Sequence, residues 1–237
     1  MPPYAPRLIV ALDYAELTPV LTLVDKLDPN TCALKVGKEL FTSLGPEVVR
    51  TLMQRGFRIF LDLKFHDIPN QVAKACKVAA DLGVWMLTLH AQGGSRMLVA
   101  ANEAIESFGA NKPLLIAVTV LTSFSQQDWQ ELSWTGDLTQ AVIHLATLTK
   151  TSGLPGVVCS AAEAALIRAH LGQDLLLVTP GIRPVGSVKG DQQRVVTPRD
   201  ACLAGSNYLV VGRPITQSNE PQQVVQQIVL DMNMSIR

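Results

Sequence analysis

Short apolar runs recur along this chain at regular intervals, and stretches with helical spacing lie between them. The runs are apolar at nearly every position, as in strands that are buried on both faces of a sheet. They fall at residues 8–13, 32–37, 58–64, 85–91, 114–121, 156–161, 175–182 and 208–215. Alternating strands and helices predict a parallel sheet with right-handed crossovers. Eight such units in 237 residues match the size of an α/β fold of the (β/α)8 TIM-barrel type.

The helical pattern is clearest at residues 46–56, 71–83 and 138–153, and each of these stretches ends at a glycine, as helices often do. The chain contains no linker or low-complexity segment, so we expect residues 1–237 to form a single domain. A doubly wound open sheet is the alternative fold. It is disfavoured by the count of eight and by the lack of G-x-G-x-x-G after the first predicted strand.

Composition and charge argue against several classes of protein. Lys+Arg and Asp+Glu balance at 20 each, which gives no indication of a nucleic-acid-binding or polybasic membrane surface. No run reaches the ~18–20 apolar residues of a membrane helix, and the N-terminus lacks the apolar segment of a signal peptide. The four cysteines are widely spaced and resemble buried thiols of a reducing compartment. We therefore predict a cytoplasmic protein that binds neither nucleic acid nor membrane.

Polar residues stand at the ends of the predicted strands. In a (β/α)8 barrel the carboxyl ends of the strands converge on one mouth, where active sites lie. Several of these residue types are rare in purely structural strands, so the set predicts an active site there. Its members are Asp13, Lys35, Asp62, Lys64, His90, Thr122, Ser160, Arg183 and Arg213.

The segment FLDLKFHDIP places three charges at the end of the third run. Asp62 and Lys64 would share one face of the strand, because side chains alternate along a strand. Asp67 follows in a loop that could fold back or reach a partner subunit. A lysine between carboxylates is favoured in its charged form, which suits a proton donor better than a Schiff-base nucleophile. Lys35 would face the same mouth. For the three charges of this segment, the alternative is a surface ion pair, which stabilises little. For Lys35, the alternative is a strand-end lysine whose ammonium extends to solvent.

The loops after the last two runs are typical of a phosphate site. In barrels of this type, the loops that follow strands seven and eight frequently bind phosphate. Arg183 and Arg213 would supply donors, and Gly212 would let a backbone N–H approach the anion. The polar, glycine-containing segment 185–195 predicts a closing lid, with an ordinary surface loop as the alternative.

The remaining candidates carry less specific signals. Asp13 could accept hydrogen bonds from sugar hydroxyls or cap a helix that begins near Leu17. Thr122 and Ser160 could bind a base or a ribose, or only their own turns. His90 is interpreted as a strand-end histidine rather than a catalyst. No cluster of His, Asp and Glu residues has the spacing of a known metal site, so we predict no metal and no cofactor.

Taken together, these segments resemble the orotidine 5'-phosphate decarboxylase family over nearly the whole chain, from IVALDY to VVGRPIT. The resemblance rests on LKVGKELF, FLDLKFHDIPNQV, LTLHAQGG, AVTVLTS, GVVCSA, TPGIRP and GDQQR. It implies a (β/α)8 barrel and a homodimer with shared active sites. It also implies decarboxylation of orotidine 5'-phosphate to UMP and CO2 without a cofactor, the last step of de novo pyrimidine nucleotide synthesis.

The resemblance further implies a role for each site residue. Lys64 would protonate C6 of the pyrimidine, and the network of alternating charge would consist of Lys35, Asp62, Lys64 and Asp67. Asp67 would reach the active site of the other subunit together with its neighbours Ile68 and Gln71. The other substrate-binding residues would be Asp13 and Thr122 at the ribose, Ser160 at the pyrimidine, Gln192 between base and phosphate, and Arg183, Gly212 and Arg213 at the phosphate.

Other activities share the D-x-K-x-x-D pattern. A sugar-phosphate decarboxylase or aldol-type synthase that works through a metal-bound enediolate would need further carboxylate oxygens for magnesium. Here Phe60 stands two residues before Asp62, where such a ligand would be useful. A Schiff-base aldolase that uses Lys64 or Lys35 is a second possible function, and a non-catalytic phosphate-binding barrel is a third.

Overall fold

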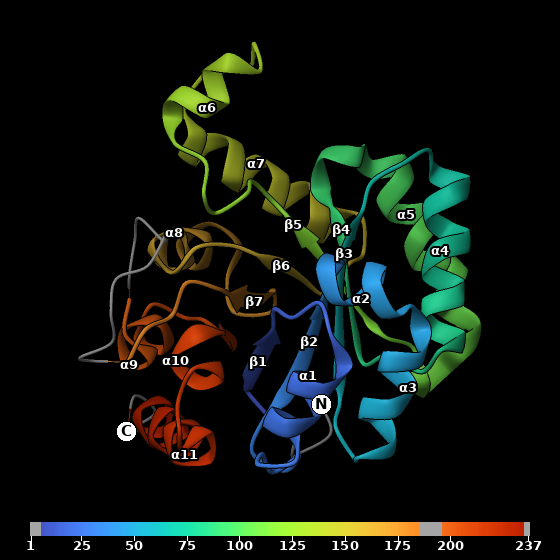
Figure 1. The fold of residues 1–237 in the computed structure, drawn as a ribbon. Helices are drawn as coiled ribbons and strands as arrows, with labels where there is room; N and C mark the ends of the chain where they lie inside the picture. The colour runs from blue at the N-terminus through green and yellow to red at the C-terminus, as the bar shows by residue number, and fades with distance from the viewer. Residues whose placement is uncertain (1–5, 185–195, 235–237) are drawn as a thin grey trace.

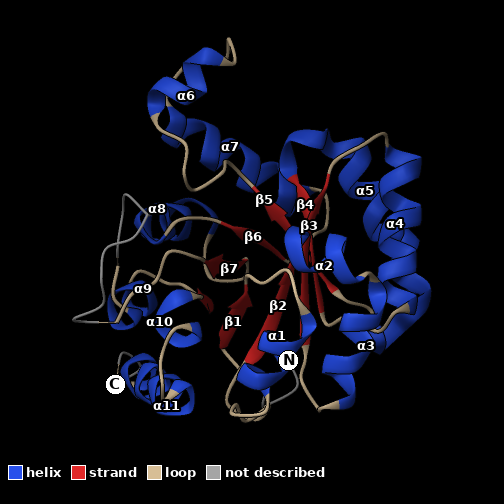
Figure 2. Ribbon diagram, viewed as in Figure 1, coloured by secondary structure: helices blue, strands red, loops and turns tan. Residues whose placement is uncertain are grey.

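Eight parallel strands form a closed barrel in the computed structural model, which describes residues 6–184 and 196–234. Each strand pairs with the next in the chain, and β8 pairs with β1. Figure 2 shows the strands at the centre with helices around them. The strands are β1 (Leu8–Leu12), β2 (Ala33–Gly37), β3 (Ile59–Phe65), β4 (Met86–His90), β5 (Leu114–Val118), β6 (Gly156–Val158), β7 (Leu176–Thr179) and β8 (Tyr208–Val211). The predicted (β/α)8 TIM barrel is confirmed.

Helices connect the strands and cover the barrel from outside (Figure 1). They are α1 (Leu17–Val24), α2 (Lys38–Leu44), α3 (Pro46–Gln54), α4 (Pro69–Asp81), α5 (Gly94–Ile105), α6 (Gln126–Glu131), α7 (Leu138–Thr151), α8 (Ala161–Leu171), α9 (Pro198–Leu203), α10 (Arg213–Thr216) and α11 (Pro221–Asn233). Two 3-10 turns, Ala91–Gly93 and Glu106–Asn111, flank α5. In Figure 1, α6 stands away from the barrel at the top of the view. None of the helices in the described part of the chain is long and apolar enough to cross a membrane.

The helix ends follow the glycine signals in the sequence. Gly56 and Gly83 come two residues after α3 and α4, and their φ angles of 88° and 89° lie in the left-handed region. A residue without Cβ adopts this conformation at little cost, so each glycine ends its helix and turns the chain into the next strand.

The observed strands end earlier than several of the predicted runs. The prediction of a strand over 208–215 was wrong for its last residues, because β8 ends at Val211 and Arg213 begins helix α10. Pro214 lies in the first turn of that helix, where its missing N–H costs no hydrogen bond and its fixed φ suits the helix. The polar residues after β5 to β8 therefore lie in the loops and helix starts of the mouth rather than in the strands.

Two apolar layers hold the fold together, and strand alternation separates them. Ile9 and Ala11 belong to the cluster inside the barrel, whereas Leu8 and Val10 belong to the larger cluster between strands and helices. Both faces of each strand are thus buried, which explains why the runs are apolar throughout. Asp62 lies two positions beyond Phe60, a member of the inner cluster, and so continues the inner face of β3 to the mouth.

Candidate active site

A cavity of about 180 Å³ opens at the carboxyl ends of the strands. Its charged wall is formed by Lys35, Asp62 and Lys64. The rest of its lining is mainly apolar and consists of Phe60, Val118, Leu121, Thr122, Val158, Val178, Pro180 and Val210. Apolar cavities of ~150 Å³ bind benzene, so this one has the size for a single ring, with one side exposed to charges.

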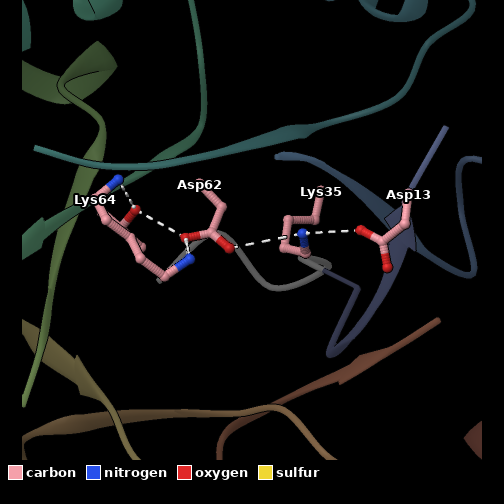
Figure 3. A network of polar contacts seen from close by, with 5 residues as sticks. Asp13, Lys35, Asp62 and Lys64 are labelled. Atoms are coloured by element: carbon pink, nitrogen blue, oxygen red, sulfur yellow. Dashed lines mark hydrogen bonds and ion pairs between the residues drawn. The ribbon is translucent and has the colours of Figure 1, made fainter. Parts of the chain in front are cut away.

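Four charged side chains lie in a row along this wall, from Lys64 through Asp62 and Lys35 to Asp13 (Figure 3). Lys64 Nζ donates a hydrogen bond of 2.8 Å to Asp62 Oδ1. Lys35 Nζ lies 3.6 Å from Asp62 Oδ2 and 3.6 Å from Asp13 Oδ1. The signs alternate along the row, so each ammonium has a carboxylate beside it. We call these four residues the charge chain.

Burial makes three members of the charge chain more than a surface ion pair, whereas the fourth, Asp13, is 68% exposed. The side chains of Lys35 and Asp62 are 13% and 12% exposed, and that of Lys64 is 25% exposed. Gly37 leaves room for the Lys35 ammonium, because a Cβ at this position would lie 3.1 Å from Nζ. Charges in such surroundings interact more strongly than on the surface. The interpretation of Asp62 and Lys64 as a solvated surface pair is therefore wrong.

The two lysines keep Asp62 ionised. Burial alone would raise the pKa of this carboxyl, but the Lys35 and Lys64 ammonium groups, with hydrogen bonds from Lys64 and Thr88, hold its pKa below the usual range. A fixed negative charge therefore stands at the wall of the cavity at neutral pH.

The backbone of β3 is irregular at Lys64. Its φ is 54°, and the pairing of β3 with β4 shifts between Leu61 and Phe65. The left-handed conformation is unfavourable for a residue with a Cβ, and such strain is concentrated at functional sites. Simple alternation predicted that Asp62 and Lys64 share a face, and both do line the cavity, but the backbone reaches this arrangement through a bulge.

His90 ends β4 beside the charge chain. Its ring lies 5.4 Å from that of His66, and its buried Nδ1 has no hydrogen-bond partner among the described residues. Burial first, and then the neighbouring His66, Lys64 and Lys38, lowers the pKa of His90 to about 4. His90 is thus neutral at physiological pH and adds no positive charge to the mouth.

The structure brings other predicted residues to the same mouth. Thr122 is exposed in the loop after β5 and lines the cavity. Ser160 precedes α8, and its buried Oγ has no partner in the part of the chain that is described. Asp13 does not cap α1, whose N-cap residue is Glu16, and its carboxylate belongs to the charge chain instead.

The predicted phosphate residues lie on the side of β7 and β8. Arg183 is buried after β7 and donates a 2.9 Å hydrogen bond to the Ile182 carbonyl. Gly212 precedes α10, and the exposed Arg213 begins it. Gln192 and the predicted lid at 185–195 lie outside the described residues.

Asp67, Ile68 and Gln71 do not join the charge chain of their own protomer. All three are exposed, and Ile68 is 63% exposed although it is apolar. Asp67 Oδ1 accepts a 2.6 Å hydrogen bond from the Ile68 N–H. Within a single protomer the structure therefore leaves these side chains directed to the surface at the start of α4.

Comparison with known proteins assigns the chain to a family. The model of the orotidine 5'-phosphate decarboxylase / HUMPS family matches residues 6–228. The chain belongs to this family. A relative from Vibrio cholerae serotype O1, named orotidine 5'-phosphate decarboxylase, is 57% identical over 223 residues, which cover 94% of this chain and 96% of the relative. A relative of the same name from Aliivibrio fischeri is 56% identical over 226 residues, covering 95% and 97%.

A solved structure gives the same result for the fold. The orotidine 5'-phosphate decarboxylase from Lactobacillus acidophilus superimposes with a TM-score of 0.87 at 38% identity, covering 97% of this chain and all of that one. The family-wide resemblance expected from the motifs is confirmed.

The donor set at the mouth offers few oxygen ligands for a metal ion. Phe60, two residues before Asp62, is 1% exposed and forms part of the cavity lining, so it supplies no oxygen ligand there. Both Asp62 oxygens already face lysine ammonium groups. Among the described residues, no three His, Cys, Asp or Glu side chains gather as they would around a metal ion.

One residue of the site was missed in the sequence. Thr88 lies in β4, is fully buried, and donates a 2.9 Å hydrogen bond to Asp62 Oδ1. The sequence could have indicated Thr88, because its hydroxyl stands in the otherwise apolar run MLTL, two residues before the strand-end His90. A buried polar side chain in a barrel strand needs a partner, and the partner here is the charge chain.

Proposed function

We propose that this chain decarboxylates orotidine 5'-phosphate to UMP and CO2 without a cofactor, the last step of de novo pyrimidine nucleotide synthesis. The observation that carries the proposal is the charge chain on the wall of a ring-sized apolar cavity. Relatives that are 56–57% identical over almost their full length bear the name of this enzyme.

Lys64 is the catalytic acid in this proposal. When the bond between C6 and the carboxylate breaks, CO2 leaves and the electron pair stays on C6. The Lys64 ammonium stabilises this developing charge and then transfers a proton to C6, after which the neutral amine regains a proton from solvent. Asp62 keeps the ammonium in place through the 2.8 Å hydrogen bond.

Asp62 has a second effect on the reaction. Its ionised carboxylate lies at the cavity wall, where the carboxylate of the substrate would also stand. Two negative charges at close range repel each other, and the repulsion falls when CO2 leaves. Lys35 holds Asp62 from the other side, and Asp13, at the solvent end of the charge chain, is placed to accept hydrogen bonds from ribose hydroxyls.

The remainder of the nucleotide extends out of the cavity towards the loops. Ser160, with its free Oγ, would bind the pyrimidine, and Thr122 would contact the ribose. Arg183, Gly212 and Arg213 would bind the phosphate, with Gln192 between phosphate and base. The phosphate is distant from C6, so its binding energy serves to position the ring and to offset the repulsion at Asp62.

A spectrophotometric assay with orotidine 5'-phosphate, with and without EDTA, tests the proposed activity. We expect conversion to UMP at the same rate in both samples. A metal-dependent reaction predicts loss of activity in EDTA and recovery when excess magnesium is added. No conversion in either sample, with protein of native circular dichroism, contradicts the proposal.

We infer further that the active sites are shared in a homodimer, with Asp67, Ile68 and Gln71 from one subunit reaching the mouth of the other. The exposed apolar side chain of Ile68 beside the exposed Asp67 carboxylate, just after the strand that carries Lys64, supports this, because an interface would bury the apolar surface. Thr122 would lie near the same interface.

Complementation between two inactive variants tests the shared site. Lys64→Ala and Asp67→Ala chains are expected to be inactive alone. When they are coexpressed, half of the dimers are mixed and each mixed dimer holds one complete site, so about a quarter of the wild-type activity should return. If both residues serve a site within one subunit, coexpression restores nothing.

A cytoplasmic location completes the proposal. The four cysteines are free thiols, and Cys32, Cys76 and Cys159 are buried. Burial raises the pKa of Cys32 and of Cys76 to about 12, so neither forms the reactive thiolate readily. Unpaired thiols suit a reducing compartment.

A further inference from the structure

The bulge in β3 is fastened by one side chain from the neighbouring strand. Leu61 pairs with Leu87 and Phe65 pairs with Leu89, so residues 62–64 of β3 lie opposite Thr88 alone. A regular parallel ladder would place one residue there. The additional chain is accommodated by the left-handed backbone of Lys64, with φ of 54°.

The Thr88 hydroxyl replaces the missing ladder contact. It accepts a 2.9 Å hydrogen bond from the Lys64 backbone N–H and donates a 2.9 Å hydrogen bond to Asp62 Oδ1. The same Asp62 oxygen accepts the 2.8 Å hydrogen bond from Lys64 Nζ. One hydroxyl therefore contacts both the backbone that carries the catalytic ammonium and the carboxylate that holds it.

Removal of this hydroxyl would break both hydrogen bonds, the one to the Lys64 backbone and the one to the Asp62 carboxylate. Thr88 is 0% exposed, so the Lys64 N–H would lose its partner where water does not readily replace it. The left-handed conformation is unfavourable for lysine and persists only while its surroundings hold it. A bulge that relaxes towards the extended conformation would move the Lys64 side chain away from Asp62.

We propose that Thr88 is a positioning residue, which sets the place of the Lys64 ammonium by holding the bulge and orienting Asp62. The inference rests on the proposed function as far as turnover is concerned. Thr88 does not line the cavity, so it acts through Lys64 and Asp62 rather than on the substrate.

The test compares Thr88→Val, which has nearly the same shape without the hydroxyl, with Thr88→Ser, which keeps it. We expect Thr88→Val to lower kcat by about 10- to 100-fold, the effect of a small misplacement of a catalytic group. Thr88→Ser should stay within about threefold of wild type. The Kd of UMP should change little in both, because the phosphate and ribose contacts remain. A Thr88→Val variant with wild-type kcat overturns the inference, and so does an equal loss of kcat and UMP affinity.

Thr179→Val is the matched control. Thr179 is also fully buried in a barrel strand, and its hydroxyl shares a 2.8 Å hydrogen bond with Ser206 Oγ away from the charge chain. This variant should keep the wild-type kcat. If it loses as much as Thr88→Val, a general effect on the barrel explains both and the inference is wrong. If Thr88→Val does not fold, Thr88→Ala removes the same hydroxyl and is judged by the same criteria.

Hydrogen exchange provides a readout that does not depend on turnover. The Lys64 amide should exchange about tenfold faster in Thr88→Val than in wild type, and should be unchanged in Thr179→Val. Unchanged exchange in Thr88→Val overturns the role of Thr88 even if kcat falls as expected. Inactive wild-type protein with the expected exchange pattern contradicts the proposed function and leaves the positioning role standing.

Discussion

The two sides of the barrel mouth are built differently. On the side of β1 to β4, Lys35, Asp62 and Lys64 lie within strands and are largely buried, and Asp62 contacts the two lysines at 3.6 Å and 2.8 Å. On the side of β5 to β8, the candidate residues lie after the strands have ended, where Thr122 and Arg213 are exposed and Ser160 and Arg183 are buried.

The difference follows from what each side has to do. Groups that stabilise a developing charge must be fixed before the reaction, because reorganisation during the reaction would cost free energy. Groups that hold a phosphate and a ribose must first let the substrate enter, and loops allow this. We therefore propose that the strand side performs the chemistry and the loop side binds the nucleotide, so that substitutions on the two sides should affect different kinetic constants.

Asp62→Asn should have a larger effect than any substitution on the loop side. It removes the negative charge between two ammonium groups while keeping the shape, so we expect kcat to fall by about 10²- to 10³-fold. Steady-state kinetics with orotidine 5'-phosphate measures this. The control is Asp25→Asn, which breaks an exposed ion pair with Arg55 of 3.1 Å and should leave kcat unchanged. Similar kinetics for the two variants would remove the distinction between the buried chain and a surface pair.

Arg213→Ala should separate binding from chemistry. Loss of a charged donor to the phosphate is expected to raise KM by about 10- to 100-fold, with a smaller effect on kcat. Arg50→Ala is the control, because Arg50 is exposed on α3 and pairs with Glu47 at 3.2 Å. A fall in kcat with unchanged KM would show that the loop side takes part in the chemistry and would contradict the division.

The smallest effect concerns stability and pH. The pKa of His90 is lowered to about 4 in the folded protein, against ~6.5 in an unfolded chain. Between these values the unfolded state binds the extra proton, so stability falls as the pH is lowered. Since His90 is only partly buried, we expect a loss of about 1 kcal/mol between pH ~7 and pH ~5 that is absent from His90→Gln. Urea unfolding at both pH values measures it, and equal pH dependence in the two proteins contradicts the low pKa of His90.

The sequence predicted the eight-stranded barrel because strands buried on both faces produce unmistakable apolar runs. It predicted that Lys35, Asp62 and Lys64 lie together, because they stand at the ends of apolar runs and strand alternation directs them to the mouth. Asp13 was expected at the ribose or as a helix cap, and its ion pair with Lys35 was not predicted. The end of β8 was placed too late, since Val211 and Ile215 are both apolar and the helix signal of Pro214 was not used.

Other features depend on contacts between distant segments. The bulge at Lys64 arises from the pairing of β3 with β4, and alternation within one strand carries no sign of it. The importance of Thr88 follows from the same pairing. The role that we propose for Asp67 needs a second subunit, so a single protomer cannot reveal it, and the proposal rests on the family resemblance and on the exposure of Asp67 and its neighbours.

The central claim is that Lys64, held in place by the charge chain, performs the chemistry while the loop side binds the nucleotide. Lys64→Ala tests it most directly when turnover and the Kd of UMP are measured on the same preparation. The account predicts that kcat falls by at least about 10³-fold, whereas UMP binds within about threefold of wild type. Turnover close to that of wild type, or loss of UMP binding in step with turnover, would contradict it.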